Sequence, residues 1–304
     1  HLLRINLIKY IDVAKPNLIL TVDAPDFFLP LAKKVKKNYS PVVHCVSPSV
    51  WAWRSERVKD LAKNVSHLLC LFPFEPKLYE STKLRTTFIG HPTARLINFL
   101  PSKSKARLEL GLNTNGFILG VFPGSRLAEV YKLFPIFIET IHILRKRIGS
   151  VSIVVPAASE RIEKVLIKFQ KQIENFFVIR RNSLKVLEAS DVALVASGTV
   201  ALESILTGRP TVAAYKLNPI SFRYIKNKML TPWITLPNQL AGTFIVPEFI
   251  QEKVTPKVLA KCLVPLLLNH PCAKFLDICK VIHSDLSVDR EKEMLDAIFS
   301  EIDR

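Results

Sequence analysis

Glycine is scarce in this chain of 304 residues, which contains 9 glycines against 20 prolines. So little glycine excludes glycine-rich linkers and fibrous repeats. Apolar residues make up 49% of the chain, which excludes intrinsic disorder and fits a globular protein. At about 150 residues per domain, the length predicts two domains, each large enough to bury its own core.

Long apolar runs are missing as well. No stretch reaches the roughly 18 uncharged apolar residues of a membrane-spanning helix, and Pro265 interrupts the longest run, Cys262 to Leu268. Charged residues also break the first apolar stretch, unlike the apolar core of a signal peptide. We therefore expect a chain that does not cross a bilayer.

Cysteine is limited to five scattered residues without a CxxC pair: Cys45, Cys70, Cys262, Cys272 and Cys279. This pattern argues against a disulfide frame or a zinc site and predicts reduced, buried cysteines in a cytoplasmic protein. The histidines lack the spacing of a metal site, so we expect neither a metal nor a cofactor. The sequence also lacks GxxxxGK[ST], GxSxG and HExxH, which argues against P-loop NTPases, serine hydrolases and metalloproteases.

Acidic residues are few: 26 Asp and Glu stand against 43 Lys and Arg, a net charge of +17. Such a charge attracts phosphates of nucleic acid, of anionic lipid or of a nucleotide-linked substrate. No helix-turn-helix, RNP signature, zinc knuckle or basic tail is present, so nucleic acid is not the expected partner. An anionic membrane surface fits at least as well.

Strand-like and helix-like stretches alternate along the whole chain. Apolar strands separated by helices favour parallel sheets covered on both faces. The sequence therefore predicts an α/β fold of two doubly wound, Rossmann-like domains that face a cleft. The predicted strands span residues 18–22, 42–46, 68–72, 87–89, 117–122, 151–155, 177–179, 192–196 and 211–214.

Prolines, serines and lysines gather in residues 91–105, where we place the domain junction. We expect an N-terminal domain over 1–97, a C-terminal domain over 98–285, and a helix in 286–304 that packs back on the first domain. Ligands of such sheets lie outside the carboxyl ends of the strands, so the residues that follow each strand are the informative ones.

Two glycine turns follow strands of the second domain. Pro123 to Arg126 offers free backbone N–H groups, a helix N-terminus and a bidentate phosphate donor. Ser197, Gly198 and Thr199 form a similar turn, and Glu203 one turn later can bind both hydroxyls of a ribose. Each turn alone also fits an ordinary helix cap, but two in one domain favour a nucleotide-diphosphate site. In the loop near residue 238, Asn238 fits a phosphate or sugar ligand and a structural turn equally well.

Polar residues also follow strands of the first domain. Asp23 stands where a general base could lie, although a turn carboxylate fits as well, and Asp26 resembles a helix N-cap. The loop from Ser47 to Arg54 contains Trp51 and Trp53, which fit a sugar or acyl-chain contact as well as a packed loop. His91 lies at the junction, where it could face the cleft, whereas the histidines at 44 and 67 fit the core.

These blocks occur together in one order that resembles the lipid-A-disaccharide synthase family, which are GT-B glycosyltransferases. The matching blocks cover nearly the whole chain: VDAPDF (22–27), VSPSVWAWR (46–54), LFPFE (71–75), FIGHP (88–92), PGSR (123–126), ASGTVALE (196–203) and LPNQLAG (236–242). The block VSPSVWAWR is very specific, whereas PGSR and SGT are shared with other glycosyltransferases.

The resemblance implies transfer of 2,3-diacylglucosamine from its UDP derivative to 2,3-diacylglucosamine 1-phosphate, with inversion and without a metal. It implies Asp23 as the general base. It assigns the donor nucleotide to Gly124, Ser125, Arg126, Ser197, Gly198, Thr199, Glu203 and Asn238, and the acceptor side to Ser47, Trp51, Trp53, Arg54 and His91. It also implies a cytoplasmic enzyme peripheral on the inner membrane of a Gram-negative bacterium. The oligomeric state stays open, a homodimer included.

The family's β-α units before residue 18, with a Gly-Glu-x-Ser-Gly-Asp motif and an amphipathic segment, are not found in this sequence. We therefore expect the first domain to be incomplete at its N-terminus. Two alternatives stay open: another UDP-sugar transferase or a UDP-GlcNAc 2-epimerase, and an inactive membrane- or nucleic-acid-binding form.

Overall fold

The computed structural model describes residues 2–35, 40–52, 55–170, 173–218, 222–223 and 228–302. The chain divides into two compact units. Unit 1 comprises His1–Arg95, Tyr224–Pro232 and Ser284–Arg304, and unit 2 comprises Leu96–Arg223 and Trp233–His283. Unit 1 therefore contains the chain up to residue 95 and again from residue 284 onward, with one short segment between.

Unit 1 is built on a four-stranded sheet whose strands are all parallel, in the order β1-β2-β3-β4. The strands are β1 (Ile19–Val22), β2 (Val42–Cys45), β3 (His67–Cys70) and β4 (Arg85–Phe88). The helices are α1 (Leu2–Ala14), α2 (Pro25–Val35), α3 (Arg57–Asn64), the short η1 (Pro76–Tyr79), α4 (Pro92–Leu96) and the C-terminal α14 (Glu291–Phe299).

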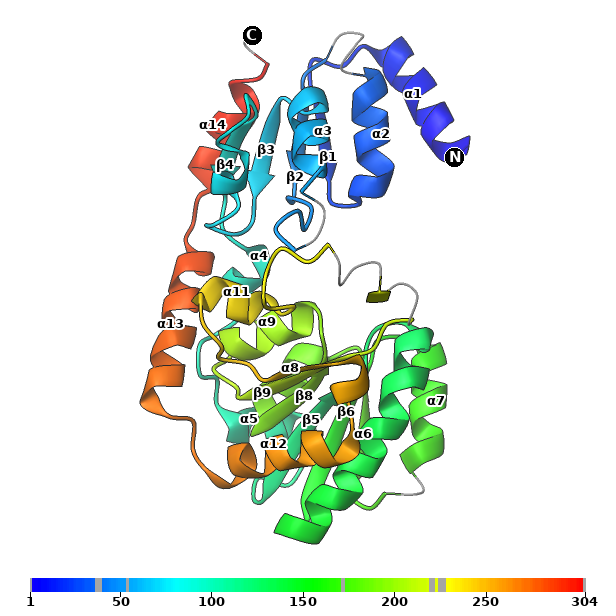
Figure 1. The fold of residues 1–304 in the computed structure, drawn as a ribbon, viewed down its shortest axis with the longest axis vertical. Coiled ribbons are helices and arrows are strands. Elements are labelled where there is room, and N and C mark those ends of the chain that lie inside the picture. Colours follow the sequence, from blue (N-terminus) through cyan, green and yellow to red (C-terminus); the bar gives the residue numbers. More distant parts are fainter. Residues whose placement is uncertain are drawn as a thin grey trace. The chain divides into compact units, whose positions relative to one another are not determined.

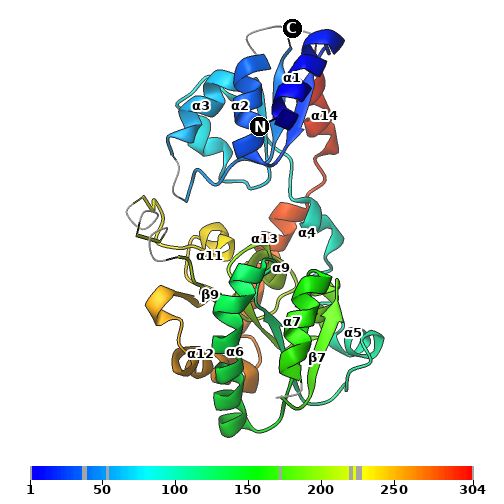
Figure 2. The same ribbon diagram turned by 90° about the vertical axis from the view of Figure 1, so that its right-hand side faces the viewer.

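Alternate residues of a strand point to opposite faces of the sheet, and helices cover both faces here. Val42 packs with α1 and α2, whereas its neighbour Val43 packs with Ala297 of α14. Figure 2 shows α14 on the side of the sheet away from α2 and α3. Beyond α14, buried Glu301 also contacts His67 and Arg85 of this sheet.

Unit 2 has a six-stranded parallel sheet in the order β10-β9-β8-β5-β6-β7. Numbered within the unit, this is the 3-2-1-4-5-6 order of the Rossmann fold, with its switch point between β5 and β8. The strands are β5 (Phe117–Phe122), β6 (Val151–Ala157), β7 (Phe176–Arg180), β8 (Val192–Ala196), β9 (Thr211–Tyr215) and β10 (Glu248–Ile250). Figure 1 labels β5, β6, β8 and β9, and Figure 2 labels β7.

Helices cover both faces of this sheet and enclose the larger core. On one face α6 (Leu127–Ile148), α7 (Glu160–Gln170) and α12 (Pro256–Leu268) pack on residues such as Leu119, Val121 and Leu194. On the other lie α5 (Lys103–Glu109), α8 (Ser183–Ala189) and α9 (Thr199–Leu206), and Gly120 meets Ser190 there. The remaining elements are α11 (Leu236–Ala241), η2 (Gln251–Lys253) and α13 (Ala273–Ser287).

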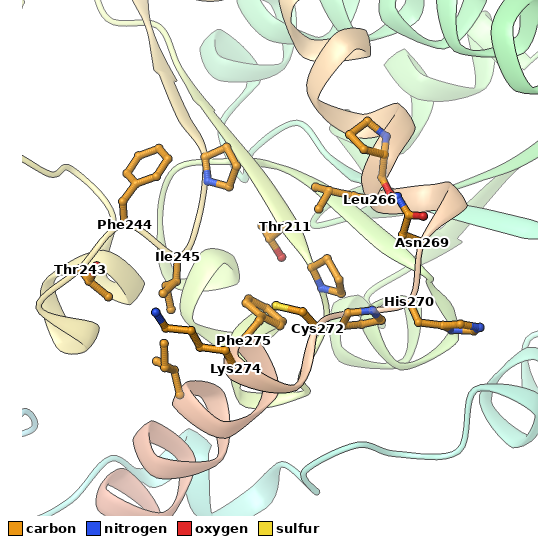
Figure 3. A pocket seen from close by; sticks show the side chains of 15 residues that line it. Thr211, Thr243, Phe244, Ile245, Leu266, Asn269, His270, Cys272, Lys274 and Phe275 are labelled. Atoms are coloured by element: carbon orange, nitrogen blue, oxygen red, sulfur yellow. Dashed lines mark hydrogen bonds between the residues drawn. The ribbon is translucent and has the colours of Figure 1, made fainter.

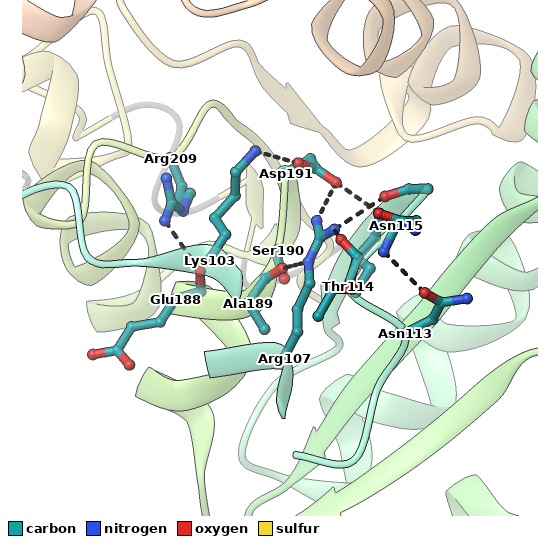
Figure 4. A network of polar contacts seen from close by, with 12 residues as sticks. Lys103, Arg107, Asn113, Thr114, Asn115, Glu188, Ala189, Ser190, Asp191 and Arg209 are labelled. Carbon is teal, nitrogen blue, oxygen red and sulfur yellow. Dashed lines mark hydrogen bonds and ion pairs between the residues drawn. The ribbon is translucent and has the colours of Figure 1, made fainter. Parts of the chain in front are cut away.

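A polar network fastens the amino ends of β5 and β8 (Figure 4). The buried Arg107 guanidinium donates to Asp191 Oδ2 at 2.7 Å and to the Ala189 carbonyl at 2.9 Å. Ile118 N–H donates to the same Asp191 oxygen at 2.8 Å. Nearby, burial lowers the pKa of Arg209 to about 10, and its guanidinium binds backbone carbonyls. These contacts join the amino ends of β5 and β8 to α5 and to the chain before β8.

The nine predicted strands are confirmed, and three other expectations are wrong. Residues 236–241, expected as a loop, form α11, which ends at Gly242 in the left-handed region (φ 60°). Asp26 is not an N-cap: α2 begins at Pro25, and Asp26 in its first turn pairs with Arg57. Of the five cysteines, all expected to be buried, only Cys70 and Cys279 are; Cys45 and Cys262 are partly buried and Cys272 is exposed. The strand β10 escaped prediction because three residues show no period.

Within the part of the chain that the structure describes, no single helix is long and apolar enough to span a membrane. The pair α12 and α13 passes that test of length and composition only when joined, and the two helices are bent by 95°. The residues of α12 that face inward belong to the core of unit 2.

Candidate active site

A cavity of about 570 Å³ opens at the carboxyl ends of β5, β6, β7 and β8, around the switch point of unit 2. Its lining comes from the loops that follow these four strands. It is formed by Phe122, Pro123, Gly124, Ser125, Arg126, Glu129, Pro156, Ala157, Ala158, Arg181, Asn182, Ser183, Ala196, Ser197, Gly198, Thr199, Val200 and Glu203. The cavity therefore brings together seven of the eight residues predicted for a nucleotide.

The turn after β5 is held by a carboxylate of its own. Ser125 N–H and Arg126 N–H donate to Glu129 Oε2 at 3.2 and 3.3 Å, and Arg126 Nη1 lies 2.9 Å from Oε1. Gly124 is required here, because its φ is 115° and a Cβ would come within 2.5 Å of Glu129 Oε2. Glu129 thus occupies the position where these donors would bind an anion.

The contacts of Glu129 are of the kind that a ligand can replace. The two N–H bonds are long, and the Arg126 side chain is 80% exposed, so the ion pair is weak. The carboxylate and Arg126 also act on Tyr215 at the end of β9. Burial raises the pKa of Tyr215, Glu129 adds to the rise, and Arg126 opposes it.

The second turn leads from β8 into α9. Ser197 N–H donates to the Ala214 carbonyl at 3.2 Å, which fixes the start of the turn. Gly198 is the N-cap of α9, and its side-chain-free backbone faces open space. Glu203, one turn later, is half-buried, and desolvation raises the pKa of its carboxyl. A helix N-terminus and a carboxylate therefore line the same cavity.

Asn238 lies elsewhere and is not among the residues that line this cavity. Its side chain is fully buried, and its amide donates to the Val246 carbonyl at 2.9 Å and to Glu248 Oε2 at 3.3 Å. Its Oδ1 accepts from Ile245 N–H and Val246 N–H at 2.9 and 2.8 Å. With all four hydrogen bonds made within unit 2, this geometry favours the structural alternative.

Two charged residues of the cavity were not predicted, Arg181 and Glu129. Arg181 follows β7, has a φ of 50°, and donates its N–H to the Ala157 carbonyl at 3.1 Å. The rule that ligands lie after the strands could have found it, since the strand 177–179 was predicted. Glu129 lies in the first turn of α6, seven residues after β5 ends, where that rule gives no signal.

A second polar edge lies in unit 1. Asp23 directly follows β1, is exposed, and donates its N–H to the Cys45 carbonyl at 2.9 Å. Three residues here have left-handed backbone, with φ of 54° at Asp23, 44° at Ala24 and 79° at Val46. Such a conformation is costly for residues other than glycine, above all for a β-branched valine, and such strain gathers at functional sites.

Ser47 lies at the same edge within a buried hydrogen-bonded group. Its hydroxyl is 2.8 Å from that of Tyr79, and it also lies near Glu75. The Glu75 carboxylate is 1% exposed and accepts from Leu71 N–H and Phe72 N–H, both at 3.0 Å. Because no described cation pairs with it, burial raises the pKa of Glu75 to about 8.

The aromatic residues of this edge pack on one another. Trp51 is only 8% exposed, and its ring meets Phe74 edge-on at 5.9 Å between centroids. The ring of His91 stacks on Phe72 at 5.5 Å, and burial lowers the pKa of His91. For Trp51 this geometry favours the packed-loop alternative. Trp53 and Arg54 lie outside the residues that the structure describes.

A further cavity of about 520 Å³ lies in unit 2 where β9 and β10 begin, at the opposite edge from the first cavity. Figure 3 shows Phe244, Ile245, Leu266 and Phe275 around it, with Lys274 beside them. It has neither a glycine turn nor a carboxylate in its lining, so it lacks the features expected for a nucleotide. No group of three or more metal-ligating side chains occurs among the described residues.

The solved structures similar to this chain share its fold. A putative UDP-N-acetylglucosamine 2-epimerase from Listeria monocytogenes aligns with a TM-score of 0.63 at 12% identity, over 98% of this chain and 78% of that one. The S. aureus MnaA–UDP co-structure aligns with a TM-score of 0.57 at 12% identity, over 99% and 78%. These likenesses show the fold class, which is the predicted GT-B fold with a Rossmann-like parallel sheet in each unit.

The sequence comparisons are more specific. The model of the lipid-A-disaccharide synthetase family matches residues 2–295, and the chain belongs to this family. Lipid-A-disaccharide synthase of Aromatoleum aromaticum is 36% identical over 98% of this chain and 78% of its own length. The proteins of that name from Pseudomonas aeruginosa and Chromobacterium violaceum are 36% and 40% identical, over 99% and 81% of this chain. The chain spans 80% and 65% of their lengths.

These relatives favour the synthase family over the epimerase alternative, because the likeness to an epimerase rests on fold alone.

Proposed function

We propose that this chain transfers 2,3-diacylglucosamine from its UDP derivative to 2,3-diacylglucosamine 1-phosphate and releases UDP. The observation that carries this proposal is the cavity at the switch point of unit 2, where two glycine turns and the N-termini of α6 and α9 meet. Such turns are suited to a diphosphate. Family membership supports the identity of both sugars.

In this proposal the donor's diphosphate binds the N–H groups of Ser125 and Arg126 after Glu129 has moved away. The guanidinium of Arg126 and that of Arg181 add positive charge to the cavity. Glu203 accepts hydrogen bonds from the ribose hydroxyls. Fixed N–H donors and guanidinium groups stabilise the negative charge that develops on UDP as it leaves.

Asp23 is the general base of this proposal. The 6-hydroxyl oxygen of the acceptor attacks the anomeric carbon, the bond from that carbon to UDP breaks, and the hydroxyl proton passes to the Asp23 carboxylate. The exposed position of Asp23 directly after β1 supports this role. Ser47 and His91 remain proposed acceptor-side residues, and Asn238 holds the loop at 245–248 rather than touching the donor.

The test compares two neighbouring carboxylates. Asp23→Asn should lower kcat for UDP release at least about 100-fold, the scale of a lost general base, and leave UDP affinity unchanged. Asp26→Asn is the matched control and should keep kcat, because Asp26 pairs with Arg57 on the surface. UDP release at an equal rate without acceptor would refute the transfer itself. An active Asp23→Asn with an inactive Asp26→Asn would reverse the assignment.

We also propose that the chain works on the surface of an anionic membrane, where its lipid substrates reside. The net charge of +17 supports this proposal. Binding to vesicles with anionic lipid should weaken as salt rises from 0.05 M to about 0.5 M, because salt screens surface charges. Equal binding to neutral and anionic vesicles would contradict the electrostatic part.

A further inference from the structure

The cavity where β9 and β10 begin has a wall of apolar side chains. It is lined by Phe244, Ile245, Leu266, Phe275 and Ile278, and prolines complete the wall. Its volume of about 520 Å³ lies in the range of small-molecule sites, which are concave and mostly apolar. Phe244 is 58% exposed, so an apolar ligand that covers it would remove apolar surface from water.

The wall of this cavity is held in place by its own backbone contacts. Beside β9, the Pro210 carbonyl accepts the N–H of Ala193 at 2.9 Å. Where α12 ends, the Pro265 carbonyl accepts the backbone N–H and the side-chain amide of Asn269 at 3.1 and 2.9 Å, and Pro271 follows in the bend before α13. Proline fixes its own φ. A wall that is ordered before binding loses little conformational freedom when a ligand enters.

One cation of the lining is left for a ligand. The Thr211 hydroxyl is used within the fold, since it donates to the Arg209 carbonyl at 3.0 Å. Lys274 on α13 is exposed, and no residue in the described part of the chain pairs with its amino group. Figure 3 shows its side chain reaching toward Ile245, whereas the ring of His270 points away. Because the described lining contains no Asp or Glu, the cavity suits a ligand with an apolar body and one negative charge.

We propose that this cavity binds the anion of a long-chain fatty acid, with the alkyl chain against the apolar wall and the carboxylate at Lys274 Nζ. One chain matches one cavity, and one carboxylate matches one ammonium group, whereas a lipid with two acyl chains would leave a chain outside. The inference is independent of the proposed transfer reaction. Because the cavity lies at the opposite edge of the sheet from the nucleotide cavity, the fatty acid and UDP should bind together.

Cys272 gives a direct readout of this site, because it lines the cavity and is exposed. Dodecanoate, kept below the concentration at which it forms micelles, should slow the alkylation of Cys272 by iodoacetamide. At a concentration ten times its Kd the rate should fall about 10-fold, in proportion to the unoccupied sites. Cys45 in unit 1 is the internal control and should react at the same rate with and without dodecanoate. Mass spectrometry of the two peptides measures both rates.

The alkyl chain and the charge are tested separately. From dodecanoate to decanoate to octanoate, each lost methylene should weaken binding about 3- to 4-fold, the effect of one buried methylene. Lys274→Gln should weaken dodecanoate binding about 3- to 10-fold, as expected for a partly exposed ion pair, and leave the binding of neutral dodecanol unchanged. Lys280→Gln, exposed on the same helix and outside the cavity, is the matched control and should bind dodecanoate normally.

A bulky side chain tests the cavity itself. Ile278→Trp should fill it and abolish the protection of Cys272, whereas Val281→Trp, at an exposed position of the same helix outside the cavity, should keep it. If Ile278→Trp does not fold, the surface variant Lys274→Gln still decides. Equal affinities for octanoate and dodecanoate, or for dodecanoate and dodecanol, would overturn the inference. Equal protection of Cys272 by anionic phospholipid vesicles without free fatty acid would also overturn it, because it would assign this surface to a membrane.

Discussion

Both units contain a glutamate that accepts hydrogen bonds from two backbone N–H groups just before it, but one glutamate is buried and the other lines a cavity. After β3, Glu75 accepts the N–H groups of the residues three and four positions before it, and after β5, Glu129 does the same. Glu75 is 1% exposed and binds at 3.0 Å. Glu129 binds at 3.2 and 3.3 Å and pairs with the exposed Arg126.

The difference shows how one motif can serve structure or binding. Buried donors bound by a buried carboxyl have no access to a ligand, so the turn of Glu75 supports the aromatic packing around it. At the switch point of unit 2, the same kind of donors face a cavity, beside the exposed guanidinium of Arg126. Glu129 there occupies the place of an anion until one binds. Its hydrogen bonds satisfy the N–H groups of the turn, and they are weak enough for a ligand to replace.

The buried carboxyl should give the largest effect, on stability. Because the pKa of Glu75 is about 8 in the fold and near 4.5 in the unfolded chain, the unfolded chain binds fewer protons between these values. The free energy of unfolding should therefore fall as pH rises from about 5 to 8. Glu75→Gln should remove this loss and be the more stable protein at pH 8, by on the order of a few kcal/mol.

Urea unfolding of both proteins at several pH values checks this, and their difference isolates Glu75 from all other groups. A difference that does not change between pH 5 and 8 would show that Glu75 is ionised in the fold.

The next largest effect concerns Arg126, the cation beside Glu129, and its contribution to UDP affinity. Arg126→Ala should weaken UDP binding by about 1.5–3 kcal/mol, the scale of a hydrogen bond between charged groups. Calorimetry gives the affinity, and the thermal shift with UDP should shrink accordingly. Lys132→Ala, exposed on the same helix and outside the cavity, is the control. An unchanged UDP affinity in Arg126→Ala would exclude this turn as the phosphate site.

The smallest effect has the opposite sign. Glu129→Gln removes the negative charge that competes with a diphosphate, so UDP should bind about 3- to 10-fold more tightly. The exposed Glu139→Gln on the same helix should leave the affinity unchanged. Weaker UDP binding in Glu129→Gln would mean that this carboxylate supports the ligand instead of taking its place.

Much of the fold follows from local pattern. The apolar runs ending at Phe122 and Ala196 predicted β5 and β8, and the glycines that follow predicted both turns of the cavity. Parallel strands place their carboxyl ends at one edge, so these two turns, far apart in sequence, had to lie near each other if the strands were neighbours. The family could also be predicted from short sequence motifs.

Tertiary contacts decided what the polar side chains do. Whether Asn238 faces a ligand depends on the loop at 245–248, which takes all of its hydrogen bonds. Whether the ring of Trp51 is available to a ligand depends on its packing against Phe74. The contact of buried His44 Nδ1, at 2.7 Å, is with the hydroxyl of Thr21, which comes from another strand. Spacing along the chain sets which elements form, but burial and hydrogen bonding of a side chain depend on distant residues that fold around it.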